Sequence, residues 1–482
     1  MINRMQDRFI RQWLMLGCLV ALFFQVAWAS GCRKPEASAG VKVVDLLVLG
    51  GTVVTMNDAR NLYQPGGVAV ADGVIVAVGK KAQISSTYGA QQVIETGFYD
   101  LVIPGLVNGH NHAAMTLLRG VADDLALMDW LQQYIFPAEA QMVDKEFVRI
   151  GTELAALEMI RTGTTTFTDM YYFEETAAEV VDRAGLRAVL GETVIGFPSP
   201  DHPTPEATLE WTAGFIERWQ DHGRVIPAVA PHAAYSVSSE ILQDSAALAR
   251  QYNVPLLIHL AETADEIHQI RELYDATPTQ YLESLGFLGP NLVAFHAVWL
   301  NDDDLTTLQR HRVGLVHNPE SNMKLASGVM RVEDVRTAGI PLGIGTDGAA
   351  SNNDLDLFAA MLSAALLQKH VRIDPRALPA TAVVAMATIE GARALHMEET
   401  IGSLEVGKRA DIVVIDGNSP NAVPRYDAYS HLVYAAHGAD VRATVVDGQV
   451  LYLDGEYRTL DMDAVLSAAR AIAGQILQAV QP

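Results

Sequence analysis

The chain has 482 residues, 50% of them hydrophobic, and its 57 acidic and 34 basic residues give a formal net charge of −23. A chain of this length can bury a large core, and a surface this acidic repels the phosphates of nucleic acids. We therefore exclude a nucleic-acid polymer as a partner, while composition alone identifies no substrate.

Residues 1–32 have the layout of an export signal. Three arginines precede an apolar run over residues 13–29. The run ends either in a small-residue cleavage site at 27–29 or in the lipobox-like sequence ASGC at 29–32, in which Cys32 would be lipidated. An uncleaved membrane anchor is a third alternative. All three place the protein outside the cytoplasm, so we expect a periplasmic protein or a lipoprotein attached to the membrane through Cys32.

Cysteine usage restricts the kind of metal site that the chain can hold. The only cysteines are Cys18 and Cys32, and both lie in the N-terminal segment. Nothing after residue 32 can form a disulfide bond or a thiolate metal site. Any metal in the folded part of the chain must therefore be bound by histidine, aspartate or glutamate.

Residues 42–100 are predicted to form short strands joined by turns. After an apolar run over residues 43–49, two further runs at 68–70 and 74–78 flank Asp72-Gly73, which is the sequence of a tight hairpin turn. No helical period is present, so we expect a small β unit.

Residues 101–400 alternate between strand-like apolar runs and longer segments with helical spacing, such as Phe147 to Ile160. This alternation predicts parallel βα units, and eight strands are the number that closes a (β/α)8 TIM barrel. The predicted strands are the one that ends at His112 and those over residues 164–169, 186–194, 225–232, 255–262, 292–296, 313–317 and 340–347.

Residues 401–460 return to short strands and turns, with apolar runs over residues 411–416 and 441–446, and a C-terminal helix is predicted over residues 461–482. The simplest assembly joins residues 401–460 to residues 42–100 in one β-sandwich. The expected fold class is therefore α/β, a (β/α)8 TIM barrel with a β-sandwich built from N- and C-terminal segments.

Histidines and acidic residues gather where the predicted strands end, and this is where a TIM barrel places its chemistry. His110 and His112 are two residues apart, so both imidazoles point to the same side of an extended strand. Six of the fourteen histidines fall at strand ends, a concentration that random placement would not produce. The strand-end residues are His110, His112, His232, His259, Glu262, His296, His317 and Asp347.

Three imidazoles and one carboxylate suit a divalent transition metal that activates water, with zinc expected and iron(II) as the alternative. We assign the ligands as His110, His112, His259 and Asp347. Glu262 lies three residues beyond His259 and can reach a substrate without binding the metal, as a proton shuttle should. His296, on the next strand, can hydrogen-bond the attacking hydroxide or polarise the developing charge. No lysine ends a middle strand, so one metal ion is favoured over a pair bridged by a modified lysine.

Five motifs carry a resemblance to a known family. They are PGLVNGHNH at 104–112, TLLRG at 116–120, HLAET at 259–263, HNPESNMKL at 317–325 and GTDGAASNN at 345–353. Over about residues 42–460 the chain resembles the amidohydrolase superfamily. Within it, the chain resembles the mononuclear deaminases typified by 5′-methylthioadenosine/S-adenosylhomocysteine deaminase, with the triazine hydrolases of the ATZ/TRZ branch as near relatives. The resemblance implies the same four metal ligands, with Glu262 moving protons and His296 beside the attacking hydroxide.

The resemblance also implies three substrate contacts. Glu139 matches a glutamate that binds ribose hydroxyls, His232 matches a substrate-contacting histidine, and Trp130 matches an aromatic wall of the pocket. Users of S-adenosylhomocysteine in this family resemble one another in an arginine, after the third strand, that meets the amino-acid carboxylate. This chain has no arginine between Arg187 and Arg218. A neutral 5′-thioether or adenosine is therefore easier to accommodate.

These observations predict hydrolytic deamination of an adenine nucleoside to the inosine analogue and ammonia. The candidate substrates are 5′-methylthioadenosine, adenosine and S-adenosylhomocysteine, and the enzyme would be a hydrolase of carbon–nitrogen bonds in cyclic amidines. The alternative on the same fold is an amidohydrolase or chlorohydrolase of triazines or other N-heterocycles. A lipid-anchored solute-binding protein is a third alternative, disfavoured because the ligands and the proton shuttle are intact. The sequence leaves open whether copies of the chain form a homo-oligomer.

Overall fold

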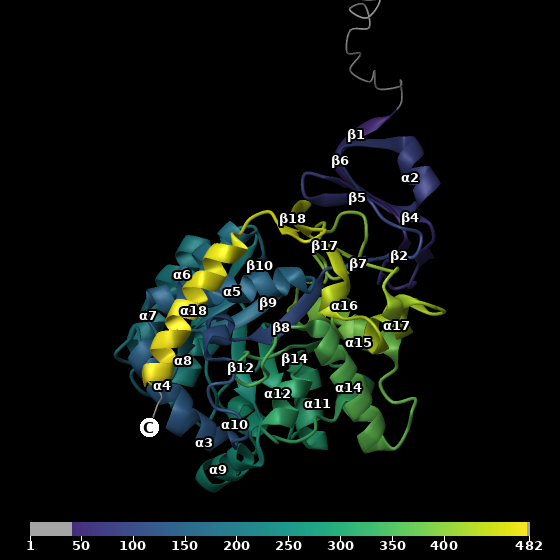
Figure 1. Cartoon of the computed structure of the whole chain (residues 1–482). Coiled ribbons are helices and arrows are strands. Elements are labelled where there is room, and N and C mark those ends of the chain that lie inside the picture. The colour runs from purple at the N-terminus through teal and green to yellow at the C-terminus, as the bar shows by residue number, and fades with distance from the viewer. Residues whose placement is uncertain (1–40, 480–482) are drawn as a thin grey trace, which may run out of the picture.

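The computed structural model describes residues 41–479 of the chain. Figure 1 shows a large barrel of strands wrapped by helices and a smaller β-rich part, from which the N-terminal end of the described chain emerges. The predicted export signal and Cys32 lie outside the described residues. Within residues 41–479, no helix combines the length and the apolar character needed to cross a membrane.

Eight parallel strands form a closed barrel in the order β8 to β15, and β15 pairs with β8 through Ile344 and Asn108 to complete the ring. The predicted α/β class and the (β/α)8 TIM barrel with added sheets are therefore confirmed. The barrel strands are β8 (Leu106–Asn111), β9 (Thr164–Tyr171), β10 (Arg187–Val194), β11 (Val225–Pro231), β12 (Leu256–Leu260), β13 (Leu292–His296), β14 (Gly314–His317) and β15 (Leu342–Ile344).

Helices follow the barrel strands and cover the outside of the barrel (Figure 1). Local signals set their ends. The Thr263 hydroxyl accepts a hydrogen bond from the backbone N–H of Glu266 where α9 (Ala264–Tyr274) begins, and Gly185, with a φ of 84°, ends α6 (Glu174–Ala184). The other helices of this layer are α5 (Lys145–Arg161), α7 (Pro205–Trp219), α8 (Ser239–Tyr252), α10 (Pro278–Ser284), α11 (Asp302–His311), α12 (Pro319–Lys324), α13 (Val332–Thr337), α14 (Leu357–Arg372), α15 (Ala380–Met386) and α16 (Ile389–Ala394).

The smaller part contains two sheets that enclose an apolar core between them. One has four strands in the order β5-β4-β1-β6, and the other has seven in the order β19-β18-β17-β16-β7-β2-β3, with strands from both ends of the described chain. Its strands are β1 (Lys42–Gly50), β2 (Thr52–Val54), β3 (Leu62–Tyr63), β4 (Gly66–Ala71), β5 (Val74–Lys80), β6 (Tyr88–Glu95), β7 (Leu101–Pro104), β16 (Ile412–Ile415), β17 (Val441–Val446), β18 (Gln449–Leu453) and β19 (Glu456–Tyr457). Three short elements lie between β16 and β17, namely η3 (Pro420–Ala422), α17 (Ala428–Tyr434) and η4 (Gly438–Asp440). The last helix, α18 (Met462–Ala479), comes after β19.

Two local predictions are wrong. The single strand expected to end at His112 is two strands, because β7 joins the seven-stranded sheet and only β8 joins the barrel. The chain passes between them at Gly105, where any side chain would collide with Thr165. The expected β unit also contains a short helix, α2 (Lys81–Thr87), which buries only Ile84 and so leaves no helical period in the sequence.

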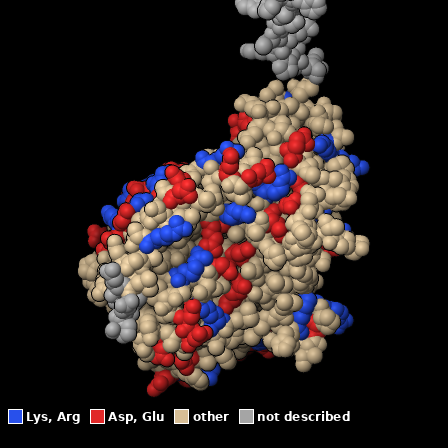
Figure 2. Space-filling model, in the orientation of Figure 1, with Lys and Arg blue, Asp and Glu red and all other residues tan. Residues whose placement is uncertain are grey.

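Charged side chains of both signs are interspersed over the barrel on the face shown in Figure 2. They form no continuous basic patch there. This distribution agrees with the exclusion of a nucleic-acid partner.

Arg187 ties the barrel to the seven-stranded sheet. It begins β10, its side chain is 1% exposed, and its Nη2 lies 2.7 Å from Asp447 Oδ1 and 3.3 Å from Asp411 Oδ1. Its Nη1 donates a 3.0 Å hydrogen bond to the carbonyl of Gly223. Asp411 is buried as well, so neither charge has water as an alternative partner.

Replacing this guanidinium should destabilise the fold strongly. We expect Arg187→Ala to lower the free energy of unfolding by about 3–5 kcal/mol, because it leaves a buried carboxylate without a counter-charge. Arg376→Ala, which removes an exposed pair with Asp374, should leave stability nearly unchanged. Urea unfolding followed by circular dichroism measures both variants, and an equally small effect at the two positions would contradict the assigned role.

Candidate active site

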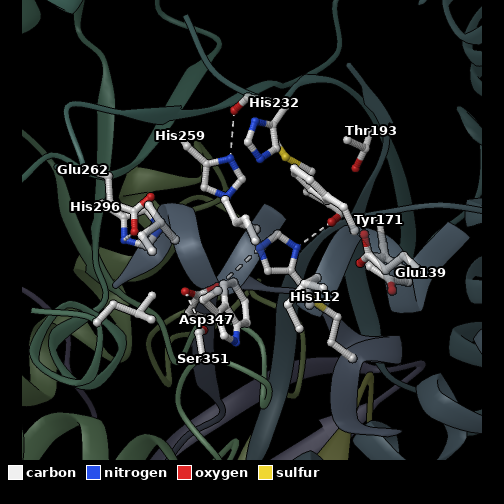
Figure 3. Close-up of a pocket in the computed structure, with 18 of the residues that line it drawn as sticks. His112, Glu139, Tyr171, Thr193, His232, His259, Glu262, His296, Asp347 and Ser351 are labelled. Carbon is white, nitrogen blue, oxygen red and sulfur yellow. Dashed lines mark hydrogen bonds and ion pairs between the residues drawn. The ribbon is translucent and has the colours of Figure 1, made fainter. Parts of the chain in front are cut away.

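The strand-end residues predicted as metal ligands meet at the carboxyl end of the barrel. The Nε2 atoms of His110 and His112 each lie 3.3 Å from Oδ1 of Asp347. One nitrogen from each of His110, His112 and His259 lies within 4.8 Å of the other two. One possible ligand atom from each of His110, His296 and Asp347 likewise lies within 4.8 Å of the other two. In Figure 3 the side chains of His112, His259 and Asp347 point into one cavity.

Backbone carbonyls fix how two of the imidazoles are oriented. Nδ1 of His112 lies 2.6 Å from the carbonyl of Met170, and Nδ1 of His259 lies 2.8 Å from the carbonyl of His232. A carbonyl can only accept, so Nδ1 of each ring carries the proton and Nε2 presents a lone pair to the cavity. This is the tautomer that a metal ligand requires.

Hydroxyls and a backbone N–H hold the carboxylate of Asp347. Ser321 and Ser351 donate to its Oδ2 at 2.6 and 2.8 Å, and the N–H of Gly348 donates to Oδ1 at 2.7 Å. Burial alone would raise the pKa of Asp347, but the surrounding imidazoles outweigh burial and hold it well below its usual range. The group is therefore a fixed anion among imidazoles.

The donor set fits a divalent transition metal. His110 is completely buried and neither of its ring nitrogens has a hydrogen-bond partner among the described residues. Burial lowers its pKa to about 3, so the ring is neutral and its lone pair is available. Buried polar atoms are nearly always satisfied in folded proteins, and a cation shared with Asp347 would satisfy this one.

Glu262 and His296 lie at one side of the cavity, beside the ligands. Oε1 of Glu262 lies 3.9 Å from Nδ1 of His296 and accepts a 3.4 Å hydrogen bond from Ser327. Nδ1 of His296 lies 2.8 Å from Oδ1 of Asn322. Burial raises the pKa of the Glu262 carboxyl, which makes a proton on it easier to keep near neutral pH.

A segment between β8 and α5 forms the opposite wall of the cavity. It consists of η1 (Ala113–Leu118), α3 (Leu127–Trp130), η2 (Leu131–Ile135) and α4 (Phe136–Met142). Trp130 and Glu139 line the cavity from this segment, and His232 lines it from the end of β11. Glu139 and Glu262 lie on opposite sides of the pocket in Figure 3. All the predicted site residues except His110, which is buried beneath the others, therefore line one pocket.

Sequence reasoning missed several residues of the site. Tyr171 lies beside Glu139, and Ser321 and Ser351 hold Asp347. Both serines stand inside the family motifs, at residues 317–325 and 345–353, so those motifs contain a sequence signal for them. His317 ends β14 as predicted, yet it is buried and does not line the pocket.

The model of the amidohydrolase family matches residues 101–451, which is more than half of the chain. The chain belongs to the amidohydrolase family. The family resemblance inferred from the five motifs is therefore confirmed.

Similar proteins within this amidohydrolase group carry deaminase names. A 5-methylthioadenosine/S-adenosylhomocysteine deaminase of Syntrophobacter fumaroxidans is 46% identical over 91% of this chain and 99% of its own. A 5′-deoxyadenosine deaminase of Methanosarcina mazei is 41% identical over 91% of this chain and 100% of its own. A zinc-bound adenosine deaminase structure from Xanthomonas campestris has a TM-score of 0.89 at 37% identity, covering 91% of this chain and all of its own. An atrazine chlorohydrolase structure from Arthrobacter aurescens, at 23% identity and a TM-score of 0.82 over 89% of this chain and 100% of its own, shares the fold.

The buried Glu139 should reduce the stability of the protein as pH rises. Burial raises its pKa from 4.5 to about 8, so the unfolded chain loses this proton first and stability falls between those two values. We expect Glu139→Gln to raise the free energy of unfolding at pH 8 by about 2 kcal/mol or more, at about 1.4 kcal/mol per pKa unit, and to have little effect at pH 4.5. Unfolding curves at both pH values test this. The exposed Glu179→Gln is the control, and a gain that is the same at both pH values would contradict the prediction.

Proposed function

We propose that this amidohydrolase removes the 6-amino group of an adenine nucleoside by hydrolysis, giving the inosine analogue and ammonia. The observation that carries the proposal is the position of Glu262, which lies beside the proposed ligand cluster without belonging to it and faces Glu139 across the pocket. One carboxyl group is thus available to move protons and a second to bind the sugar. The deaminase names of relatives that match 91% of the chain support the same reaction.

Four side chains would hold one divalent ion in this proposal, with zinc expected and iron(II) as the alternative. They are His110, His112, His259 and Asp347. When bound, such an ion supplies a water of lowered pKa and a positive charge near the carbon under attack. The zinc in the Xanthomonas campestris adenosine deaminase structure supports the choice of metal.

Proton movements fall to three residues of the chain. Glu262 gives a proton to the ring nitrogen next to C6, which makes C6 more electrophilic. Asp347 and Glu262 then carry the two protons of the attacking water as its oxygen bonds to C6. One proton goes to the departing amino group, which leaves as ammonia when its bond to C6 breaks, and the other returns to Glu262. His296 donates toward the oxygen that joins C6 and stabilises the charge that develops there.

Substrate recognition falls to the other residues around the pocket. Glu139 accepts hydrogen bonds from the ribose hydroxyls, His232 contacts the substrate, and Trp130 forms an aromatic wall. A triazine has no hydroxyl pair for Glu139, and the likeness to the triazine hydrolase structures extends to the fold alone. We therefore prefer a nucleoside as substrate.

The N-terminal sequence supports a further proposal about location. A charged and then apolar segment ending at Cys32 favours an exported enzyme, either periplasmic or anchored as a lipoprotein. Radiolabelled palmitate incorporated into the wild-type chain but not into Cys32→Ala would support the lipid anchor.

Glu262→Gln should separate metal binding from turnover. We expect the variant to keep its metal and to lose about 10²–10⁴-fold in kcat, because glutamine matches glutamate in shape but cannot carry the proton. The exposed Glu240→Gln is the matched control and should keep full activity. Ammonia release and ultraviolet absorbance of adenosine measure turnover, and plasma mass spectrometry measures bound metal. Appreciable remaining activity in Glu262→Gln would rule out the assigned role.

A further inference from the structure

A second group of side chains that could share a metal ion lies outside the catalytic pocket. Glu192, Asp201 and His202 each offer one ligand atom, and these three atoms lie within 4.8 Å of one another. We call these residues the β10 cluster. None of the three lines the catalytic pocket. Among the residues that the structure describes, every other group of this kind belongs to the active site.

Glu192 brings to the β10 cluster a carboxyl oxygen that has no partner. The residue lies on β10, its side chain is completely buried, and its Oε2 accepts a 2.9 Å hydrogen bond from the N–H of Glu174. Its Oε1 has no hydrogen-bond partner within residues 41–479. Burying a carboxylate oxygen in this way costs free energy, so the oxygen requires either a proton or a cation.

Backbone and hydroxyl contacts fix the other two residues of the cluster, which lie in the loop after β10. The carboxylate of Asp201 accepts 2.7 Å hydrogen bonds from the N–H of Phe173 and from the hydroxyl of Ser199. The N–H of His202 donates to the same hydroxyl at 3.0 Å. Nε2 of His202 lies 3.9 Å from Oδ2 of Asp201. This distance is too long for a hydrogen bond, but two atoms that each bind one zinc ion at about 2.0–2.2 Å can stand this far apart.

No basic side chain neutralises these carboxylates. Among the described residues, no lysine or arginine forms an ion pair with Glu192, with Asp201 or with the neighbouring Glu174, whose Oε2 also lacks a partner. Arg218 lines a surface hollow beside Asp201 but pairs with Glu175. Burial and the neighbouring carboxyls raise the pKa of Glu192 well above its usual range. The cluster therefore lacks a positive charge, which either a proton or a metal ion can supply.

The imidazole of His202 favours the metal ion. A proton shared by two carboxyl groups needs no third ligand, whereas an imidazole nitrogen beside two carboxylates is a donor set that suits zinc. Asp201 and His202 line the surface hollow, and the side chain of His202 is 12% exposed. An ion in solution therefore has a path to the cluster.

We propose that Glu192, Asp201 and His202 bind a second divalent ion, zinc, with a structural role. The ion joins β10 to the loop over residues 195–204, which leads to α7. This loop carries Phe197, whose ring centroid lies 5.2 Å from that of Phe136 in the wall of the catalytic pocket. The ion thus holds the loop against the wall of the pocket without touching the substrate.

The number of zinc ions bound to the full chain tests this proposal. The protein is stripped with a chelator, reloaded with zinc, separated from excess zinc by gel filtration and measured by plasma mass spectrometry. We expect two ions per wild-type chain and one in Glu192→Gln and in His202→Ala. The exposed Glu210→Gln and His268→Ala are the matched controls and should keep two. One ion in the wild-type chain, or an unchanged count in either cluster variant, would overturn the proposal.

A background without the active-site ion isolates the proposed one. His112→Ala combined with Asp347→Asn should leave one zinc ion per chain, and adding Glu192→Gln should leave none. Zinc should raise the Tm of the doubly substituted chain by at least about 2 °C and leave that of the triply substituted chain unchanged, because an ion that binds only the folded chain stabilises it. A doubly substituted chain that binds no zinc would contradict the second site.

Anomalous diffraction at the zinc edge needs no variant and decides the matter if the substituted chains fail to fold. In crystals of the zinc-loaded wild-type protein we expect a peak among Glu192, Asp201 and His202, separate from the one in the catalytic pocket. Its absence would overturn the proposal. Neither result bears on the proposed deamination, which is followed by ammonia release.

Discussion

The site depends on placing three imidazoles and a carboxylate at one buried point, where neither ring nitrogen of His110 has a hydrogen-bond partner among the described residues. The Nε2 atoms of His110 and His112 face the same oxygen of Asp347, and His259 presents its free nitrogen from the other side. Burying such groups unpaired costs free energy, and one shared cation would satisfy all of them together. Carbonyls hold the Nδ1 atoms of His112 and His259 and so leave their Nε2 atoms to face the metal, while hydroxyls fix the carboxylate of Asp347.

The backbone at the strand ends carries part of this constraint. His296 and Asp347 both have positive φ, 67° and 64°, a conformation that residues other than glycine rarely adopt. The N–H of Asp347 donates a 3.0 Å hydrogen bond to the carbonyl of His110, so the end of the last strand is tied to the end of the first. Strained conformations of this kind persist where the surrounding structure imposes them, and they are commonly found at functional sites. Barrel closure therefore determines where these side chains point.

Much of this arrangement could be predicted from the sequence, because strand ends and i, i+2 spacing are local features. The eight strands, the barrel and the gathering of His110, His112, His259 and Asp347 follow from these local features.

Features that depend on distant neighbours could not be predicted. A glutamate in the first turn of a helix suggests a solvated residue, yet Glu139 is 5% exposed because its segment packs against Tyr171. Likewise, β7 and β8 are both apolar, and no periodicity tells which sheet each one joins.

The central claim is that four side chains from three separated parts of the chain share one metal ion. Anomalous X-ray diffraction at the zinc edge, from crystals of the zinc-loaded protein, tests it most directly. We expect one strong peak in the catalytic pocket, at the carboxyl end of the barrel, within about 2.0–2.2 Å of ligand atoms of His110, His112, His259 and Asp347. No peak there, a second ion of equal occupancy in the pocket, or a ligand shell that lacks Asp347 or His259 would contradict it.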